Sequence, residues 1–393
     1  MGVGTPLMAI IKSVSAWGMT VLTRYPGVVA VFGFAAGVSS FFLVEREQEI
    51  FAQALSILML ASWLWLVAEN LLHRQIKRWF DVSLPRPILK FLTQLVHQES
   101  LFFVIPFFFV TTAWNSGQAI FTTLLIGFGI ISILDPLYYR WLSRRRWLYF
   151  IYHSVTLFAV LLTALPMLLH IPTGTSYLHA LVIAVILSVF SVERDLPWRW
   201  YWSTLMVAVL MAAAIGFGIL VRPWVPPASL WLTDVAITSE IDNAQRAPQN
   251  KLLVVSEGQL KKGLYAYTSI HAPRGLHERI YHEWTLNGET VDRIALDIHG
   301  GREEGYRAWT HKLNFPLQSQ GHWQIRVTTE AGQLIGILRF SVVEALRGQI
   351  HRIDSQFGGF NTRSAGRIES VSGNDQLGQQ INSMGSRGSN DIQ

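Results

Sequence analysis

The hydrophobic and polar positions divide the chain into two regions. Between residues 25 and 221, long apolar runs alternate with short polar loops. Between residues 229 and 344, no apolar run approaches the roughly 20 residues that a helix needs to cross a bilayer, and apolar residues recur at every second position. The first pattern is typical of transmembrane helices and the second of half-buried strands. We therefore predict a polytopic α-helical membrane domain followed by an all-β domain.

Seven apolar runs in the first region each predict a transmembrane helix. The third run is short, so we expect its helix to begin near Ile88, and Pro106 should bend it. Residues 5–24 predict an amphipathic helix on the membrane surface, with a poorly ordered N-terminus as the alternative. We expect the first run to be retained rather than cleaved as a signal peptide, because further runs follow it. The seven runs are residues 25–44, 51–72, 100–114, 119–139, 148–169, 176–192 and 201–221.

Lysine and arginine are distributed unevenly over the loops between these runs. They are frequent before the first run and after the second, fourth and sixth runs. After the first, third, fifth and seventh runs, the loops carry only Arg46 and Arg222. Because positive residues are retained in the cytoplasm, this alternation predicts a cytoplasmic N-terminus and a β domain on the opposite side of the membrane.

The composition supports a membrane protein and narrows its chemistry. Of the 393 residues, 50% are hydrophobic and 15% are charged, against about 25% charged residues in soluble domains. Positive loops on the cytoplasmic side account for the net charge of +6, so we do not expect nucleic acid as a partner. The chain has no cysteine, which excludes disulfides, thiolate metal sites and cysteine nucleophiles.

Short alternating segments in the second region predict seven or eight strands. Asn287 and Gly288 join two of these segments and match the two-residue turn of a β-hairpin. Strands at this spacing favour an antiparallel sandwich of the immunoglobulin-like type over residues 229–344. Residues 222–228 predict a stiff proline-rich linker, and residues 345–393 predict a disordered tail because apolar residues are sparse there. The predicted strands are residues 235–241, 252–256, 264–270, 279–286, 290–298, 306–313, 323–328 and 334–343.

One segment of the second region resembles a known protein family. The resemblance rests on His282-Glu-Trp284, Asn287-Gly288, Gly305-Tyr-Arg-Ala-Trp-Thr310, Gly321-His-Trp-Gln-Ile-Arg-Val327 and Gly332-Gln-Leu-Ile-Gly336. These motifs look like the C-terminal periplasmic β-domain of bacterial inner-membrane or envelope proteins, a domain of unknown function. The resemblance implies a location in the bacterial envelope. It implies no reaction and no functional residues.

Three polar residues inside apolar runs are candidates for an intramembrane site. Glu69, Asp135 and His153 all lie toward the cytoplasmic ends of their predicted helices. Ionisable residues within a membrane are costly and usually functional, so the three could relay protons or bind a cation. The alternative is that each lies close enough to a helix end to be accommodated there. Glu69 would then pair with Arg74, and Asp135 with the arginines at 144–146.

Four ring-bearing residues of the β domain are candidates for a binding surface. His282, Trp284, Trp309 and His311 recur at alternate positions of two predicted strands. Exposed rings could contact a partner, whereas the alternative is that they belong to the core. No histidine or carboxylate spacing matches a metal site, and no catalytic or cofactor-binding motif is present. We therefore expect no metal and no cofactor.

These patterns predict an integral protein of the bacterial inner membrane without enzymatic activity. Its multi-pass helical domain lies in the lipid bilayer, and its periplasmic β domain is expected to bind a protein or a glycan of the envelope. One alternative is a transporter or membrane enzyme that uses the intramembrane polar residues. Another is an envelope sensor, in which binding to the β domain shifts the helices.

Overall fold

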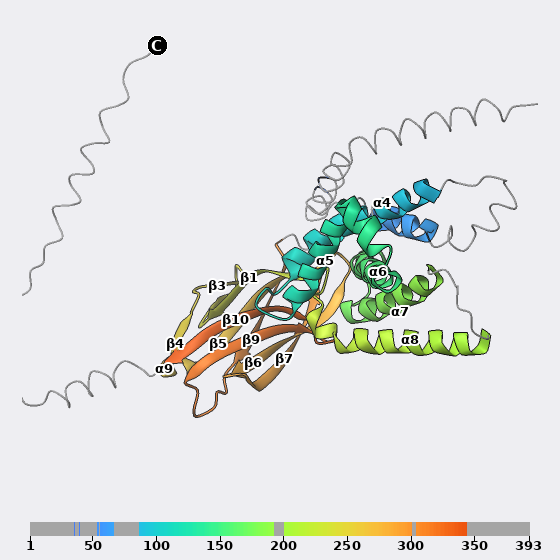
Figure 1. The fold of residues 1–393 in the computed structure, drawn as a ribbon. Coiled ribbons are helices and arrows are strands. Elements are labelled where there is room, and N and C mark those ends of the chain that lie inside the picture. The colour runs from blue at the N-terminus through green and yellow to red at the C-terminus, as the bar shows by residue number, and fades with distance from the viewer. Residues whose placement is uncertain are drawn as a thin grey trace, which may run out of the picture. The chain divides into compact units, whose positions relative to one another are not determined.

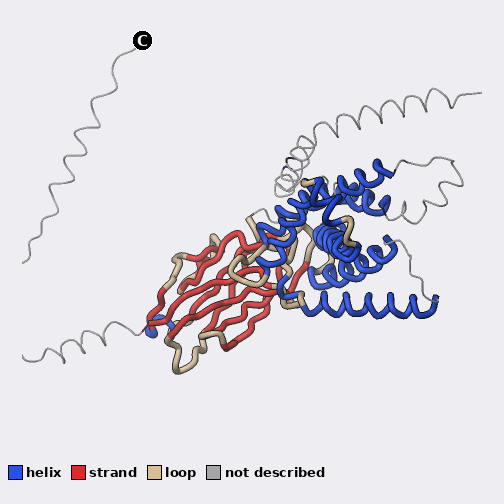
Figure 2. Tube along the Cα trace, viewed as in Figure 1, coloured by secondary structure: helices blue, strands red, loops and turns tan. Residues whose placement is uncertain are grey.

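The computed structural model of the chain shows apolar helices first and strands afterwards (Figures 1 and 2). We call residues 53–220 the helical part and residues 231–343 the β part. Both belong to one compact unit that extends to Glu344. The structure describes residues 53, 54, 56–66, 86–191, 200–300 and 304–343, together with the single positions 35 and 39.

Several predictions made from the sequence concern residues that the structure does not describe. The predicted amphipathic helix at 5–24 and the predicted tail at 345–393 lie outside the described residues. The predicted helix at 25–44 does so too, apart from the two single positions. Glu69, one of the three intramembrane candidates, also lies outside.

Apolar helices joined by short connections make up the helical part. α4 contacts α5 and α6, and α7 contacts α6 and α8. The contacts between consecutive helices are expected, because elements joined by few residues usually lie side by side. The bounds are α4 (Arg86–Thr111), α5 (Gln118–Ile133), the π-helix η1 (Pro136–Leu142), α6 (Arg146–Leu169), α7 (Thr173–Ser191) and α8 (Trp200–Leu220).

The prediction of seven transmembrane helices is wrong for the part of the chain that the structure describes. Two helices there are long and apolar enough to cross a membrane, Lys90–Thr111 within α4 and Arg146–Leu169. A third span results only if α5 and η1 count as one bent span. In the other apolar helices, the stretches whose side chains the structure describes have 10–17 residues, short of the roughly 20 that a bilayer requires. These stretches are Ser56–Leu66, Thr173–Ser188 and Leu205–Leu220.

The helix predicted at 119–139 is broken before Pro136. α5 ends at Ile133, and Leu134 has an extended backbone with φ −90° and ψ 95°. The chain restarts as η1, which is bent by 102° from α5. Proline lacks an N–H group and its ring clashes with the preceding turn, so a straight helix does not pass through this position. The apolar run alone therefore overestimates the length of this helix.

Two sheets that share one hydrophobic core form most of the β part. The smaller sheet has the strand order β1-β5-β8 and the larger has β4-β10-β9-β6-β7. Trp284 and Trp323 are fully buried in the core, and Trp323 stacks on Phe340 with ring centroids 5.8 Å apart. The larger strands are β1 (Trp231–Thr238), β5 (Leu264–His271), β6 (His277–Leu286), β7 (Glu289–His299), β8 (Tyr306–Lys312), β9 (Gly321–Thr329) and β10 (Leu334–Val343). The shorter elements are β2 (Ile241–Asp242), β3 (Ala247–Pro248), β4 (Val254–Ser256) and the helical turn α9 (Glu257–Leu260).

The larger sheet is mixed, which corrects the predicted antiparallel sandwich of the immunoglobulin-like type. β4 runs parallel to β10 and pairs Val254 with Ser341. Alternation along a strand indicates which side chains are buried, but it does not indicate the direction of the neighbouring strand. That direction depends on the connection: β1 belongs to the smaller sheet, and β2 and β3 intervene before β4 joins the larger one.

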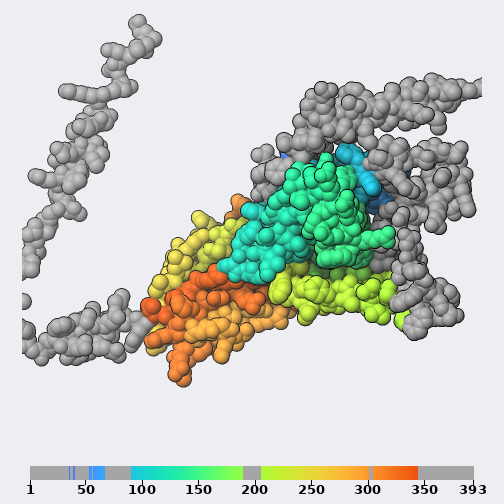
Figure 3. All heavy atoms as spheres, viewed as in Figure 1, coloured from blue at the N-terminus to red at the C-terminus, as the bar shows by residue number. Residues whose placement is uncertain are grey.

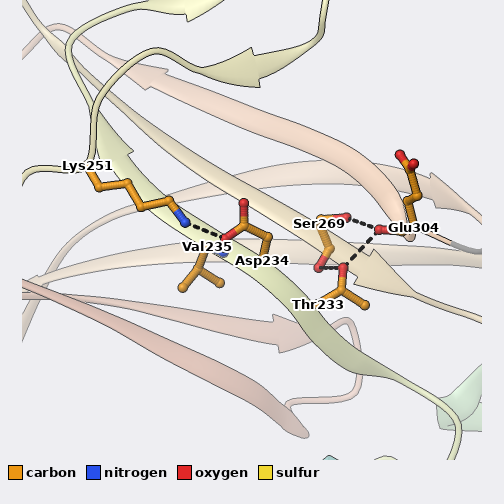
Figure 4. A network of polar contacts seen from close by, with 6 residues as sticks. All are labelled: Thr233, Asp234, Val235, Lys251, Ser269 and Glu304. Carbon is orange, nitrogen blue, oxygen red and sulfur yellow. Dashed lines mark hydrogen bonds and ion pairs between the residues drawn. The ribbon is translucent and has the colours of Figure 1, made fainter. Parts of the chain in front are cut away.

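A bulge in β1 is held by a small polar network (Figure 4). The register between β1 and β5 shifts between Leu232 and Asp234. The Thr233 hydroxyl lies 3.2 Å from the Ser269 carbonyl oxygen and 3.0 Å from the Glu304 carbonyl oxygen. The Ser269 hydroxyl donates to the same Glu304 oxygen at 2.7 Å. These bonds fix the start of β8 to the smaller sheet.

Candidate functional site

A pair of histidines lies buried between α4 and α6. Nε2 of His97 and Nδ1 of His153 are 3.0 Å apart, and the two side chains are 0% and 4% exposed. Tyr138 of η1 reaches the same place, with its hydroxyl 3.1 Å from Nδ1 of His97. The bend before Pro136 brings η1 into this position. Polar side chains from three elements therefore converge inside an apolar bundle.

The backbone of α4 determines where the ring protons lie. Nδ1 of His97 is 2.7 Å from the carbonyl oxygen of Thr93, which can only accept a hydrogen bond. We therefore assign the proton of His97 to Nδ1, which leaves Nε2 as an acceptor. His153 must then donate from its own Nδ1. In this neutral pair, Nε2 of His153 carries a lone pair.

That last nitrogen has no hydrogen-bond partner within the described structure. Nε2 of His153 is buried and unpaired. A buried polar group without a partner costs about 1–3 kcal/mol. This lone pair is therefore open to a proton or to another hydrogen-bond donor.

Aromatic rings enclose the histidine pair. The Trp63 ring lies 5.3 Å from the His97 ring and 4.9 Å from the His153 ring, and Tyr149 stacks on His153 at 6.1 Å. Trp63 is itself fixed, because its Nε1 donates to the Ser100 hydroxyl at 2.8 Å. The rings separate the pair from solvent and hold the imidazoles in one orientation.

Asp135 lies beside this cluster but does not enter it. Its side chain is exposed, and Nε2 of Gln94 donates to its carboxylate at 2.9 Å. Gln94 also donates to the Ser132 carbonyl at 2.9 Å, so the amide bridges the end of α5 and the residue before η1. Of the three predicted intramembrane residues, His153 is in the cluster, Asp135 is at its edge and Glu69 is outside the described residues.

Sequence reasoning missed His97, Tyr138 and Trp63. The signal for His97 was available in the polar run His97-Gln-Glu-Ser100. The third helix was expected to begin near Ile88 and so to include this run, but its apolar run began only at Ser100, and His97 was not considered as an intramembrane residue. Tyr138 had no signal of its own, since its position depends on the break before Pro136.

The four candidate residues of the β part lie on two different faces. His282 and Trp284 are fully buried in the core. Nε2 of His282 is 3.2 Å from the Thr268 hydroxyl, and its Nδ1 is 3.0 Å from the Thr310 hydroxyl. Burial lowers the pKa of His282 to about 3, so this ring is neutral and joins the two sheets.

Trp309 and His311 lie on the outer face of the smaller sheet. His311 is exposed and stacks on Tyr265 with ring centroids 3.9 Å apart. The Arg246 guanidinium lies 5.5 Å from the Trp309 ring. Trp231 and His271 form a second stacked pair at 3.9 Å, and the strand register puts it on the same face. This outer face therefore offers rings and positive charge, without His282 or Trp284.

Across the described ranges, no cluster of three or more His, Asp or Glu side chains could hold a metal ion. The histidine pair alone supplies fewer protein ligands than catalytic or structural zinc sites use.

The helical part contacts the β part directly, as the adjoining spheres of the two regions show (Figure 3). Gln118, at the start of α5, donates from Nε2 to the Leu334 carbonyl at 2.7 Å. Gln333 donates to the Val225 carbonyl at 3.1 Å, and residues 225–230 are all buried. The two parts therefore share an interface, although the sequence predicted a stiff spacer at 222–228.

Glu278 of β6 caps α7 across this interface. Its carboxylate accepts hydrogen bonds from the Thr173 backbone N–H at 2.7 Å and from the Thr173 hydroxyl at 2.9 Å. Burial raises the pKa of Glu278, and the two bonds from Thr173 oppose that rise. Arg222 lies nearby and donates to the Gly174 carbonyl at 2.9 Å. A carboxylate at a helix N-terminus also interacts favourably with the helix dipole.

Fold and site together define a protein with apolar helices, a buried histidine pair and a two-sheet β part docked on the helix ends. Residues 8–266 match the model of a family of unknown function, DUF5924, and the chain belongs to that family. Residues 277–342 match a second model, described as a protein of unknown function, DUF2914. The comparison with curated proteins found no match. The predicted resemblance to an uncharacterised family with a C-terminal β-domain is confirmed.

The boundary between the two family models falls inside the β part. The first model ends at Ala266, within β5, and the second begins at the start of β6. Nevertheless β5 pairs with β8, and β4 pairs with β10. Strands from both matched regions are therefore needed to complete each sheet.

Proposed function

We propose that this is an integral membrane protein whose helical part anchors a β part that binds a protein partner outside the cytoplasm. One observation carries the proposal. The basic residues of the described loops lie mainly at one end of the helices, and the contacts to the β part lie at the other end. The proposal names α4, α6 and the bent pair α5–η1 as membrane spans, in line with their length and composition.

The turns that contact the β part carry little positive charge. The turn between α4 and α5 and the turn between α6 and α7 contain no lysine or arginine, and the exit from α8 has only Arg222. The loop between η1 and α6 lies at the other end of α5 and α6. It carries Arg144 and Arg145, with Arg140 and Arg146 beside it.

This asymmetry supports an orientation with the β part outside the cytoplasm. Basic loops are retained on the cytoplasmic side, so the arginine-rich loop favours that side. The helices then direct their opposite ends, and the β part with them, to the far side. In a bacterial inner membrane that side is the periplasm.

The outer face of the smaller sheet is our candidate for the binding surface. It combines the stacked pairs Trp231–His271 and Tyr265–His311 with Trp309 and Arg246. Tryptophan, tyrosine and arginine are the residues that dominate binding energy at protein interfaces.

In-cell photo-crosslinking tests this surface. A photoreactive amino acid replaces His311 in the full chain, and the same substitution at exposed Glu289 of β7 is the matched control. We expect a crosslinked product of higher mass at His311 that protease digestion collapses, and none at Glu289. Equal products at both positions, no product at His311, or a product that only a glycan hydrolase collapses would contradict a protein partner.

A further inference from the structure

Three side chains form a continuous hydrogen-bonded chain inside the helical part. Tyr138, His97 and His153 are linked by contacts of 3.1 Å and 3.0 Å. The chain has a direction, because the Thr93 carbonyl holds the proton of His97 on Nδ1. It ends at Nε2 of His153, a buried acceptor without a partner among the described residues.

We propose that Tyr138, His97 and His153 form a proton wire between the interior of the helical part and the arginine-rich end of the helices. The ligand of this site is the proton itself. The inference rests on the histidine pair and does not depend on the binding function proposed for the β part.

The transfer balances atom by atom. A proton binds Nε2 of His153, and the Nδ1 proton of that ring moves to Nε2 of His97. The Nδ1 proton of His97 then moves to the Tyr138 oxygen, and the hydroxyl proton of Tyr138 passes to the oxygen of its hydrogen-bonded neighbour Tyr149, whose own hydroxyl proton goes to water. Each step forms one N–H or O–H bond and breaks another, and no electrons are transferred.

The backbone also defines the resting state of the wire. After one transfer, the bare Nδ1 of His97 faces the Thr93 carbonyl oxygen, 2.7 Å away in the resting geometry. Two acceptors in contact repel, so the tautomer of His97 with its proton on Nδ1 is the more stable one. The carbonyl thus sets the resting polarity of the wire.

The wire continues beyond Tyr138 to a second tyrosine. Tyr138 is itself 2% exposed, and its hydroxyl shares a side-chain hydrogen bond with Tyr149 of α6. Tyr149 is partly exposed and lies in the first turn of α6, directly after the arginine-rich loop. Tyr149 therefore gives protons a place to enter and leave.

The opposing interpretation is a purely structural histidine pair, and proton exchange separates the two. The full chain is labelled with ¹⁵N-histidine and embedded in lipid, and NMR measures transfer from water protons to the imidazole N–H groups. Loss of lines in His97→Gln and His153→Gln assigns the two rings. In the wild type, we expect both buried rings to exchange with water.

Tyr138→Phe is the decisive variant, because it removes the hydroxyl and keeps the ring. We expect it to slow exchange at His97 and His153 by about tenfold or more. Tyr139→Phe, at the half-buried neighbouring position, is the matched control and should leave exchange unchanged. His179 is exposed and has the same contact to a backbone carbonyl four residues earlier, so its line reports that the variants are folded.

Two results would overturn the wire. One is an absence of water exchange at both rings in the wild type. The other is unchanged exchange in Tyr138→Phe while the His179 line stays in place.

Discussion

At the scale of single residues, Glu278 and His282 show how one strand serves two interfaces. Both belong to β6 and both are buried. Glu278 faces the helical part, and its carboxylate accepts two hydrogen bonds from Thr173 at the N-terminus of α7. His282 faces the smaller sheet and contacts two threonine hydroxyls. Burial acts on both, and it disfavours the charged form in each case.

Truncation of Glu278 should weaken the interface between the parts. Glu278→Ala removes both acceptors of Thr173 and is expected to lower the free energy of unfolding by about 2 kcal/mol. Thermal unfolding of the full chain in detergent measures the loss. Glu278→Gln keeps one oxygen acceptor and should lie between Ala and wild type. Glu289→Ala, on the exposed start of β7, should change stability by less than about 0.5 kcal/mol.

His282 should make stability depend on pH. Its pKa is about 3 in the folded protein and 6.5 for an unperturbed ring. Below pH 6.5 the unfolded state binds a proton that the folded state does not, so stability falls as pH decreases toward 3. The slope is about 1.4 kcal/mol per pH unit. His282→Gln should flatten the dependence of the unfolding midpoint between pH 7 and pH 5, and His311→Gln should not.

At the scale of elements, the sequence pattern identified strands better than helices. Each of the longer strands, β5 to β10, coincides with a predicted alternating segment, and Asn287-Gly288 has the positive φ angles of 51° and 94° that its turn requires. A strand with one buried face has an apolar residue at every second position. This alternation can be seen in the sequence without knowledge of the neighbouring strands.

Other features depended on tertiary contacts that the pattern does not record. The parallel pairing of β4 with β10 follows from the path of the chain between the two sheets. The break before Pro136 shortened a helix that apolar residues alone had extended. The same break placed Tyr138 beside His97, so the candidate site could be predicted only at His153 and at its edge, Asp135.

The division of sheets between the two family models leads to a prediction about fragments. Residues 277–343 lack β1, β4 and β5, so the smaller sheet keeps only β8 and the larger sheet loses an edge strand. Without those strands the core loses Leu264, Ala266 and Ile270. We expect residues 277–343 to give the NMR spectrum of an unfolded chain, and residues 229–343 to give a dispersed one. Dispersed signals from the shorter fragment would contradict this account of the sheets.

At the scale of the whole molecule, the arginine-rich loop and the β part lie at opposite ends of α5 and α6. The buried segment 225–230 and the Glu278 cap tie the β part to those helix ends. Whatever side the turns of the helices face, the β part faces it too.

Cysteine labelling in intact cells tests the central claim most directly. The chain has no cysteine, so each variant carries a single thiol. Leu317→Cys places it on a fully exposed loop of the β part, and Ser143→Cys places it in the exposed arginine-rich loop. The account predicts that a membrane-impermeant maleimide labels Leu317→Cys in intact cells and labels Ser143→Cys only after permeabilisation of the inner membrane. The reverse pattern, or labelling of both before permeabilisation, would contradict it.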